Sequence, residues 1–268
     1  ETGLRGDYVK DYGFASLPHL SALFKIQPGL TSRLGGGLGY KAPTIFTEES
    51  ELILYKNVLP VSPTTNSLER SYGANWDVNY KKSSDKINFS VNQFFFYTYL
   101  SHPLLLDTIA NNFYKFQNIA GNIHSKGAET NITLGYNDLT LYLGYTYTDA
   151  KLTNNGVTVQ NPLTPKHRLN AALVYEIEDK LRIGSELYHF SRQLLSDGTE
   201  GRGYWLYGLV AEKEWKHLSL YVNFENIGNV RQTKFESIYT GSVANPVFKD
   251  IYAPLDGFVM NGGVIIKL

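Results

Sequence analysis

Apolar and polar residues alternate along two neighbouring segments of the chain. Apolar side chains stand at even positions from Ile132 to Tyr136, and after Asn137-Asp138 they resume at odd positions from Leu139 to Tyr147. An alternation with a period of two places the apolar side chains on one face of a β-strand. The Asn-Asp pair suits a tight turn, so we predict that the two segments form a β-hairpin.

The same alternation recurs along most of the chain and predicts an all-β protein. Strands are expected at 1–8, 17–27, 30–40, 70–81, 86–98, 115–136, 139–150, 166–177, 181–193, 203–215, 218–228 and 257–268. Most exceed the average of about 5–6 residues for a globular strand, and a transmembrane strand needs roughly 9–11. Helical character is confined to Leu104–Asn112, where we expect one short loop helix.

The connections between the predicted strands alternate in length. The short ones are Gln27–Gly29, Lys82–Asp85, Asn137–Asp138, Glu178–Lys180 and Lys216–His217, and the long ones are Lys41–Glu69, Tyr99–Tyr114, Lys151–Pro165, Leu194–Arg202 and Asn229–Asp256. Short turns at one end and long loops at the other are typical of outer-membrane barrels, whereas a soluble Greek-key sandwich mixes its loop lengths. We therefore predict an antiparallel transmembrane β-barrel.

The polar face of the strands supports a wide barrel. Opposite the apolar face of two predicted strands stand Gly73, Asn75, Asp77 and Asn79, and then Ser219, Tyr221, Asn223 and Glu225. A small closed barrel fills its interior with apolar side chains, whereas a wide barrel has a wet or plugged polar interior. These polar residues therefore indicate a wide barrel with a wet or plugged interior.

Composition narrows the classes of function. The 25 basic and 25 acidic residues give a formal net charge of zero, which argues against a nucleic-acid partner, and the absence of Cys excludes disulfides and thiolate metal sites. The 20 Tyr and 14 Phe suit strands and membrane–water interfaces. No start Met or signal peptide precedes Glu1, so we expect a piece of a longer chain.

Several short motifs follow one another along the chain. They are Arg33 with Gly39-Tyr40-Lys41-Ala42-Pro43-Thr44, Leu68-Glu69-Arg70-Ser71-Tyr72-Gly73, Asn118-Ile119-Ala120-Gly121 with Gly127-Ala128-Glu129, Gly144-Tyr145-Thr146-Tyr147-Thr148-Asp149-Ala150, Pro165-Lys166-His167-Arg168, and Asn223-Phe224-Glu225-Asn226 with Asn229-Val230-Arg231. In this order they resemble the C-terminal half of TonB-dependent outer-membrane receptors. Leu68-Glu69 replaces the family's usual Pro-Glu, and Ile251–Gly263 is similar to receptors of Bacteroidetes type.

The resemblance implies a barrel of about 22 strands closed around an N-terminal plug. About twelve strands would be present here, so residues 1–268 are expected to form the C-terminal part of the barrel, without the plug and the first strands. The family imports scarce solutes such as ferric siderophores, haem and other metal chelates across the outer membrane. The implied partners are outer-membrane lipid, such a solute, and TonB through the missing N-terminal region. The family often ends on an aromatic residue, and this chain ends on Leu268.

No motif points to catalysis or to a resident metal or cofactor. The six His show no ligand spacing, and no nucleophile elbow or paired acid and base stands out. We therefore expect a protein that is not an enzyme. The alternative is a self-contained twelve-stranded outer-membrane channel or enzyme, and a soluble β-rich binding module is a more distant third.

Solutes of such receptors are caught at the outer mouth. Along the predicted lumen-facing rows, Tyr188 and Arg192 stand at the outward ends, and the adjoining loops carry Tyr99, His102 and Tyr204. Aromatic and cationic groups together suit an anionic, partly aromatic solute such as a metal chelate. These five residues are our predicted solute-binding residues.

Overall fold

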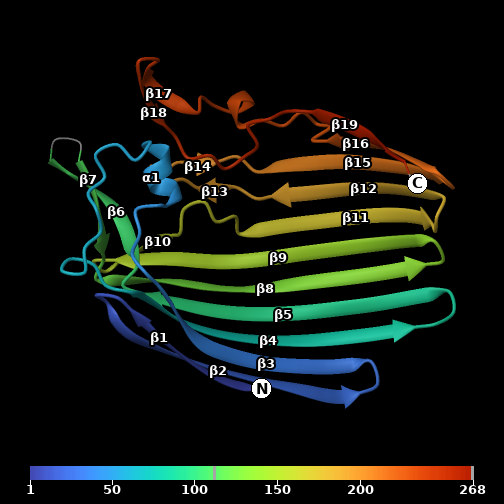
Figure 1. The fold of residues 1–268 in the computed structure, drawn as a ribbon, viewed down its shortest axis with the longest axis horizontal. Coiled ribbons are helices and arrows are strands. Elements are labelled where there is room, and N and C mark those ends of the chain that lie inside the picture. Colours follow the sequence, from blue (N-terminus) through green and yellow to red (C-terminus); the bar gives the residue numbers. More distant parts are fainter. Residues whose placement is uncertain (111–112, 267–268) are drawn as a thin grey trace.

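A computed structural model describes residues 1–110 and 113–266, and it consists of one large antiparallel sheet with loops at its ends (Figure 1). Neighbouring strands of the sheet follow chain order: β1 (Thr2–Val9), β2 (Gly13–Gln27), β3 (Leu30–Lys41), β4 (Glu69–Ser83), β5 (Ile87–Ser101), β8 (Gly121–Tyr136), β9 (Leu139–Asn154), β11 (His167–Ile177), β12 (Leu181–Phe190), β15 (Tyr204–Trp215), β16 (Leu218–Glu225) and β19 (Val259–Ile266). A further strand, β10 (Val157–Gln160), pairs only with β9. The predicted all-β, antiparallel fold is confirmed.

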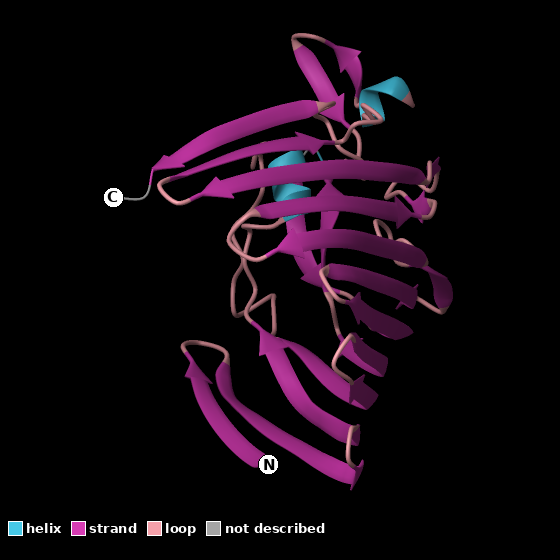
Figure 2. Ribbon diagram, turned by 90° about the vertical axis from the view of Figure 1, so that its right-hand side faces the viewer, coloured by secondary structure: helices cyan, strands magenta, loops and turns pink. Residues whose placement is uncertain are grey.

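The sheet curves into a trough and does not close, so it forms part of a barrel wall (Figure 2). Its edge strands β1 and β19 each pair with one neighbour within the described sheet. Among the described residues, no helix is long and apolar enough to cross a membrane.

The predicted hairpin from Asn131 to Tyr147 is confirmed residue by residue. Leu134 pairs with Leu141 and Ile132 with Leu143 across β8 and β9, so these four apolar side chains share one face. Asn137 occupies the turn with a φ of 50°, a left-handed conformation that Asn tolerates better than most residues.

The two faces of the trough differ as the alternation predicts. Glu186, Tyr221, Asn223 and Asn261 line a hollow of about 440 Å³ on the concave face. The apolar residues that alternate with these polar residues lie on the convex face, where Leu134, Leu143, Leu173 and Trp205 are exposed. The polar rows of the sequence therefore face the interior of the partial barrel.

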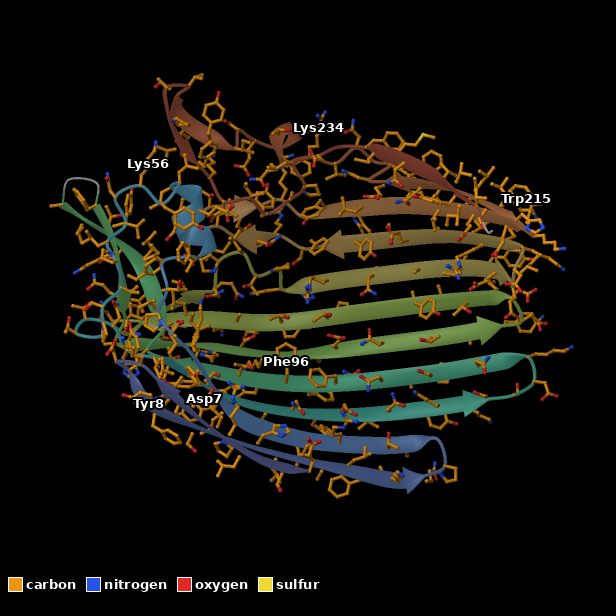
Figure 3. All side chains as sticks on the ribbon, viewed as in Figure 1. Asp7, Tyr8, Lys56, Phe96, Trp215 and Lys234 are labelled. Atoms are coloured by element: carbon orange, nitrogen blue, oxygen red, sulfur yellow. The ribbon has the colours of Figure 1, made fainter. Side chains whose placement is uncertain are left out.

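The connections separate by length between the two ends of the sheet. In Figure 1 the turns after β2, β4, β8, β11 and β15 lie at one end, and the long loops lie at the other. The short turn between β1 and β2 is an exception at the loop end, where Tyr12 N donates to Val9 O at 3.0 Å. In Figure 3, Trp215 marks the short-turn end and Tyr8 the loop end.

Two predictions about secondary structure are wrong. The expected helix Leu104–Asn112 contains β6 (Leu104–Ile109), which pairs with β7 (Phe113–Asn118); Asn111 and Asn112 lie outside the described residues. The expected strand 115–136 is interrupted, because β7 belongs to that separate hairpin and β8 begins at Gly121. An apolar run is compatible with helix or strand, and here pairing with a distant segment determines the outcome.

The long loops contain small elements that the periodicity did not predict. They are α1 (Glu48–Leu52), the 3-10 helix η2 (Gln232–Lys234), and the hairpins β13 (Gln193–Leu194) with β14 (Glu200–Gly201) and β17 (Tyr239–Ser242) with β18 (Asn245–Phe248). Thr47 caps α1 by accepting a hydrogen bond from Ser50 N at 3.4 Å. A buried apolar cluster lies in this region rather than along the sheet, and it consists of Leu195, Tyr204, Tyr252 and Ala253.

Candidate functional site

The loops at the long-loop end form two groups, and the first lies above β4 and β5. The connection from β3 to β4 packs against the β6–β7 hairpin through a bridge between Val58 and Tyr114. Asn66 Nδ2 donates to Phe116 O at 2.8 Å, and both residues are buried. Two loops far apart in sequence are therefore held together.

Asn118, from the Asn118–Gly121 motif, is the central link of this first group. Its Oδ1 accepts from Ser67 N at 2.8 Å, and its Nδ2 donates to His102 O at 2.9 Å. One amide thus joins the end of the β3–β4 loop to the end of β5. The motif residue has a structural role at this site.

The second group joins the β12–β15 loop to the β16–β19 loop. The Tyr204 hydroxyl donates to Tyr252 O at 2.9 Å, and Gln193 Nε2 donates to the same carbonyl at 3.5 Å. Ser196 N donates to Asp250 Oδ2 at 2.5 Å. These contacts surround the buried apolar cluster and fix the two loops to each other.

Gln232 organises the β16–β19 loop from within. Its side chain is fully buried; Nε2 donates to Asp250 O at 2.7 Å, and Oε1 accepts from Tyr252 N at 2.9 Å and from Ala253 N at 3.2 Å. A buried amide that satisfies three backbone groups fixes their relative positions.

The near-terminal Asn motif closes the base of the same loop. Asn226 Nδ2 donates to Val230 O at 2.7 Å and to Asp256 O at 3.1 Å, and its Oδ1 accepts from Val230 N at 2.9 Å. Asn229 Oδ1 accepts from Phe258 N at 3.3 Å. The two Asn side chains therefore connect the end of β16 to the start of β19.

Two ionisable groups in these loops have shifted pKa values. Hydrogen bonds from the hydroxyl and the backbone N–H of Thr199 lower the pKa of Asp197. Burial is the main cause that raises the pKa of the Tyr252 hydroxyl; a hydrogen bond from the backbone of Arg202 lowers this pKa, and the 2.9 Å hydrogen bond to Glu236 Oε1 raises it. Both shifts follow from structure within the loops.

The concave wall below the loops carries carboxylates held by neutral donors. Asn131 Nδ2 donates to Glu129 Oε1 at 2.6 Å, and Asn223 Nδ2 donates to Glu225 Oε1 at 2.7 Å. The Tyr188 hydroxyl donates to Glu186 Oε2 at 2.9 Å. The wall thus presents a polar, hydrogen-bonding surface.

Steric crowding explains why one position on this wall, Gly127, is a glycine. A Cβ at Gly127 would lie 2.5 Å from the Phe96 ring and 2.2 Å from Tyr147 O. The Phe96 ring therefore lies over the glycine, which explains the Gly in the Gly127-Ala128-Glu129 motif.

The structure brings three of the five predicted solute-binding residues to one end of β12 and β15. Tyr188 lies on the concave face of β12, where it pairs with Leu206. Arg192 follows β12; its side chain is 78% exposed, and its Nη1 lies 3.6 Å from Glu200 Oε2. Tyr204 is buried in the apolar cluster and stacks on Phe190 with ring centroids 5.0 Å apart.

The other two predicted residues lie elsewhere. Tyr99 is on the convex face of β5, beside Tyr72 at a ring-centroid distance of 6.2 Å. His102 follows β5 with a φ of 50° and borders a separate hollow with Arg70 and Ser67. Strands β8, β9 and β11 separate this position from β12. The five residues therefore do not form one cluster, and Tyr188 and Arg192 are the accessible pair.

The predicted solute-binding residues do not include Glu186, the partner of Tyr188, or Gln232. The alternation already places Glu186 on the polar face, two residues before Tyr188. No local pattern marks Gln232, because its partners lie 18 to 21 residues away. Among residues 1–110 and 113–266, no group of three or more His, Asp or Glu is placed to hold a metal ion.

A curved antiparallel wall with a polar concave face, an apolar convex face and long loops at one end defines the class of outer-membrane-type barrels. The family model "TonB dependent receptor-like, beta-barrel" matches residues 1–227, and the chain belongs to this family. Its members are outer-membrane β-barrels.

Solved structures with the same fold include siderophore receptors. A mutant of the ferric enterobactin receptor PfeA from Pseudomonas aeruginosa is 16% identical, with a TM-score of 0.70 over 98% of this chain and 41% of that chain. The siderophore receptor PirA from Acinetobacter baumannii is 16% identical, with a TM-score of 0.69 over 98% and 42%. The FrpB iron transporter from Neisseria meningitidis is 13% identical, with a TM-score of 0.65 over 94% and 39%.

The chain spans about two fifths of the length of these receptors. No curated protein matches it. At these identities the structural likeness establishes the fold, and the solute has to be argued from the chain's own residues.

Proposed function

We propose that residues 1–268 form the C-terminal part of the barrel of a TonB-dependent importer, which carries a ferric siderophore, haem or another metal chelate across the outer membrane. The observation that carries the proposal is the open antiparallel wall of this family with long loops at one end. The names of the similar structures, siderophore receptors and an iron transporter, support the solute class.

The wall orientation follows from the same proposal. The apolar convex face, including Leu134 and Leu141, contacts lipid, and the polar concave face lines the lumen. The long loops then face outward, with Tyr188 and Arg192 at the mouth on the way to the lumen. TonB is engaged through a plug region that precedes these strands.

The alternative is a self-contained twelve-stranded channel or enzyme. The open sheet favours the importer, because β1 and β19 each have one strand partner and would expose unpaired backbone groups without further strands. We expect residues 1–268 alone, reconstituted in liposomes, to give no selective, energy-dependent uptake. Selective uptake by this fragment would favour the alternative.

The decisive experiment uses the complete gene. A host that lacks its own siderophore receptors is complemented with the full-length protein, and uptake of radioactive iron is measured with a panel of ferric siderophores and haem, in the presence and absence of TonB. TonB-dependent uptake of at least one chelate supports the proposal. A correctly assembled receptor that takes up none of them, or that works equally without TonB, would contradict it.

A further inference from the structure

The chain contains two Asn-Gly dipeptides, Asn155-Gly156 and Asn261-Gly262. In such a pair the backbone nitrogen of the glycine can attack the side-chain amide of the asparagine, because glycine has no side chain to hinder the approach. Whether the attack occurs in a folded protein depends on how the surrounding structure holds the two groups. The fold holds these two dipeptides in different ways.

Asn155-Gly156 forms the tip of the hairpin between β9 and β10, at the long-loop end of the sheet (Figure 1). Asn154 pairs with Val157, so the dipeptide is a two-residue turn, and its φ angles are 50° and 78°. Both residues are exposed, and no described atom lies within 4 Å of a Cβ built on Gly156. Water and the attacking nitrogen therefore have free access to the Asn155 amide.

The reacting groups of this turn are not held by other parts of the protein. Within residues 1–110 and 113–266, no hydrogen bond engages the Asn155 side chain or the backbone nitrogen of Gly156. Strand β10 pairs with β9 alone, over four residues. A short hairpin with one strand partner opens locally at a low cost in free energy. The turn can therefore reach the conformation in which the glycine nitrogen meets the asparagine Cγ.

The second dipeptide is held in a strand. Asn261 Nδ2 donates to Glu225 Oε1 at 3.2 Å, which holds the group that would have to leave. Gly262 pairs with Val222 in the ladder between β16 and β19, and strand pairing opposes the backbone rotation that ring closure requires. Asn261 and Gly262 are exposed as well, so hydrogen bonding and strand pairing, not exposure, distinguish the two sites.

We propose that Asn155 is a site of spontaneous deamidation. The Gly156 nitrogen loses its proton to water and attacks Cγ of Asn155; the new N–Cγ bond closes a succinimide ring, the Cγ–Nδ2 bond breaks, and Nδ2 leaves as ammonia. Water then opens the ring. Attack at Cγ gives aspartate, and attack at the main-chain carbonyl carbon gives isoaspartate. In sum, one water is consumed and one ammonia is released, with no oxidant, reductant or cofactor.

The modification changes the hairpin in two ways. Both products place a carboxylate at a turn that was uncharged. In isoaspartate the main chain also runs through the side-chain carbon, which adds one atom to the two-residue turn between Asn154 and Val157. That turn fixes the register of β9 with β10, so the added atom disrupts the pairing. The outer hairpin therefore loosens with the age of the protein, while the long strands of the wall stay paired.

The test follows both dipeptides in one sample. The full-length receptor is incubated in mildly acidic and in mildly alkaline buffer, and the conversion of each Asn is measured over time by tandem mass spectrometry after digestion at acidic pH. Asn155 should be converted at least about tenfold faster than Asn261, because local opening costs less at a hairpin tip than in a paired strand. Conversion should be faster in the alkaline buffer, since the attacking nitrogen must lose its proton. A synthetic peptide of residues 152–166 gives the rate without the fold.

Hydrogen exchange of segment 151–160 provides the second readout. Exchange should become faster as isoaspartate accumulates, whereas exchange in β8 should not change. The control variant Asn155→Gly keeps the turn, because glycine adopts positive φ readily, and its exchange in 151–160 should not change with incubation. Equal conversion of Asn155 and Asn261 would overturn the proposal, and so would an intact Asn155 after the peptide has been converted. Exchange that changes with incubation in Asn155→Gly as much as in the unmodified protein would also overturn it.

Discussion

The hydroxyl of Tyr204 donates a 2.9 Å hydrogen bond to the backbone carbonyl of Tyr252. This bond connects the first residue of β15 to the loop that leads into β19, 48 residues further along the chain. Both residues are buried in the same apolar cluster. The β12–β15 loop and the β16–β19 loop are therefore held to each other by a hydrogen bond and by a shared buried cluster.

Removing this hydroxyl should loosen the loops without disturbing the wall. Tyr204→Phe keeps the stacked ring but leaves Tyr252 O with only the longer bond from Gln193, a loss of about 1 kcal/mol. We expect faster hydrogen exchange in segments 191–203 and 226–258 and unchanged exchange in β11 and β12. Tyr207→Phe, on the convex face, is the control and should change neither. Unaltered loop exchange in Tyr204→Phe would show that the apolar cluster alone holds the loops.

Gln232 should be the most sensitive single position of the same unit. Gln232→Leu removes the partners of Asp250 O, Tyr252 N and Ala253 N in a buried site, at a cost of about 1–3 kcal/mol for each group left unpaired. Limited proteolysis should then cut within 226–258 much faster than in the unmodified protein. Gln160→Leu is the matched control, because Gln160 Nε2 is buried without a hydrogen-bond partner in the described structure. Equal protease resistance of the two variants would contradict the role of Gln232.

Adjacent positions on β9 test the orientation of the wall. Leu141 pairs with Leu134 on the convex face, whereas Thr140 pairs with Val174, which borders the concave hollow. Leu141→Arg places a cation in the lipid at a cost of roughly 2–4 kcal/mol, and Thr140→Arg places it in the polar lumen. In the full-length receptor, Leu141→Arg should reduce the amount of heat-modifiable barrel in the outer membrane and Thr140→Arg should not. Equal assembly of the two would remove the membrane assignment of the convex face.

The strands of the wall could be predicted from the sequence, because the alternation of apolar and polar residues that specifies a strand is a local pattern. The alternation around Leu141 gives the strand, its two faces and, with the Asn137 turn, its register. The loops could not be predicted in this way. Leu104–Ile109 satisfies a helical pattern as well as a strand pattern, and only its pairing with Phe113–Asn118 determines which one forms.

The positions of the proposed solute-binding residues could be predicted only where they follow from local alternation. The alternation along β12 placed Tyr188 on the polar face, which is the concave face of the sheet, whereas Tyr204 was assigned to a loop near the mouth. It could not show that the loop carrying Tyr252 covers Tyr204, because that contact depends on a distant segment. Tyr99 was assigned to a loop, but β5 continues to Ser101 and turns its side chain to the convex face.

Acid should loosen the tip of the β13–β14 hairpin. Asp197 accepts hydrogen bonds from Thr199 N at 2.9 Å and Thr199 Oγ1 at 2.6 Å, and these lower its pKa below the usual 3.8. A lowered pKa means that the ionised form stabilises the folded turn, so this stabilisation is complete above pH 3.8 and is lost as the pH falls through the folded-state pKa. Exchange or cleavage at 195–200 should therefore increase on acidification. In the Asp197→Asn variant, segment 195–200 should exchange or be cleaved faster at neutral pH, and the increase on acidification should disappear. If the increase on acidification persists in this variant, another ionisable group causes it.

Arg192 is the residue of the outer mouth best placed to contact an anionic chelate. Its side chain is 78% exposed, and its ion pair with Glu200 is long, at 3.6 Å, and exposed on both sides. Such surface pairs contribute little, about 0–1 kcal/mol, so the guanidinium can exchange Glu200 for a solute at low cost. Tyr188, on the concave face of β12, the strand that precedes Arg192, offers a ring and a hydroxyl below it. Arg192→Ala in the full-length receptor should weaken binding of an anionic ferric chelate by roughly tenfold, consistent with a charged hydrogen bond of about 1.5–3 kcal/mol that is partly screened by water.

Arg182→Ala is the control, because Arg182 pairs with Glu176 at the opposite end of the wall. Binding is measured by titration calorimetry at two salt concentrations, and barrel assembly is measured alongside. A weaker affinity that becomes independent of salt, with normal assembly, would place Arg192 in contact with the solute; unchanged affinity across the chelates would exclude it and leave the plug as the main determinant of recognition.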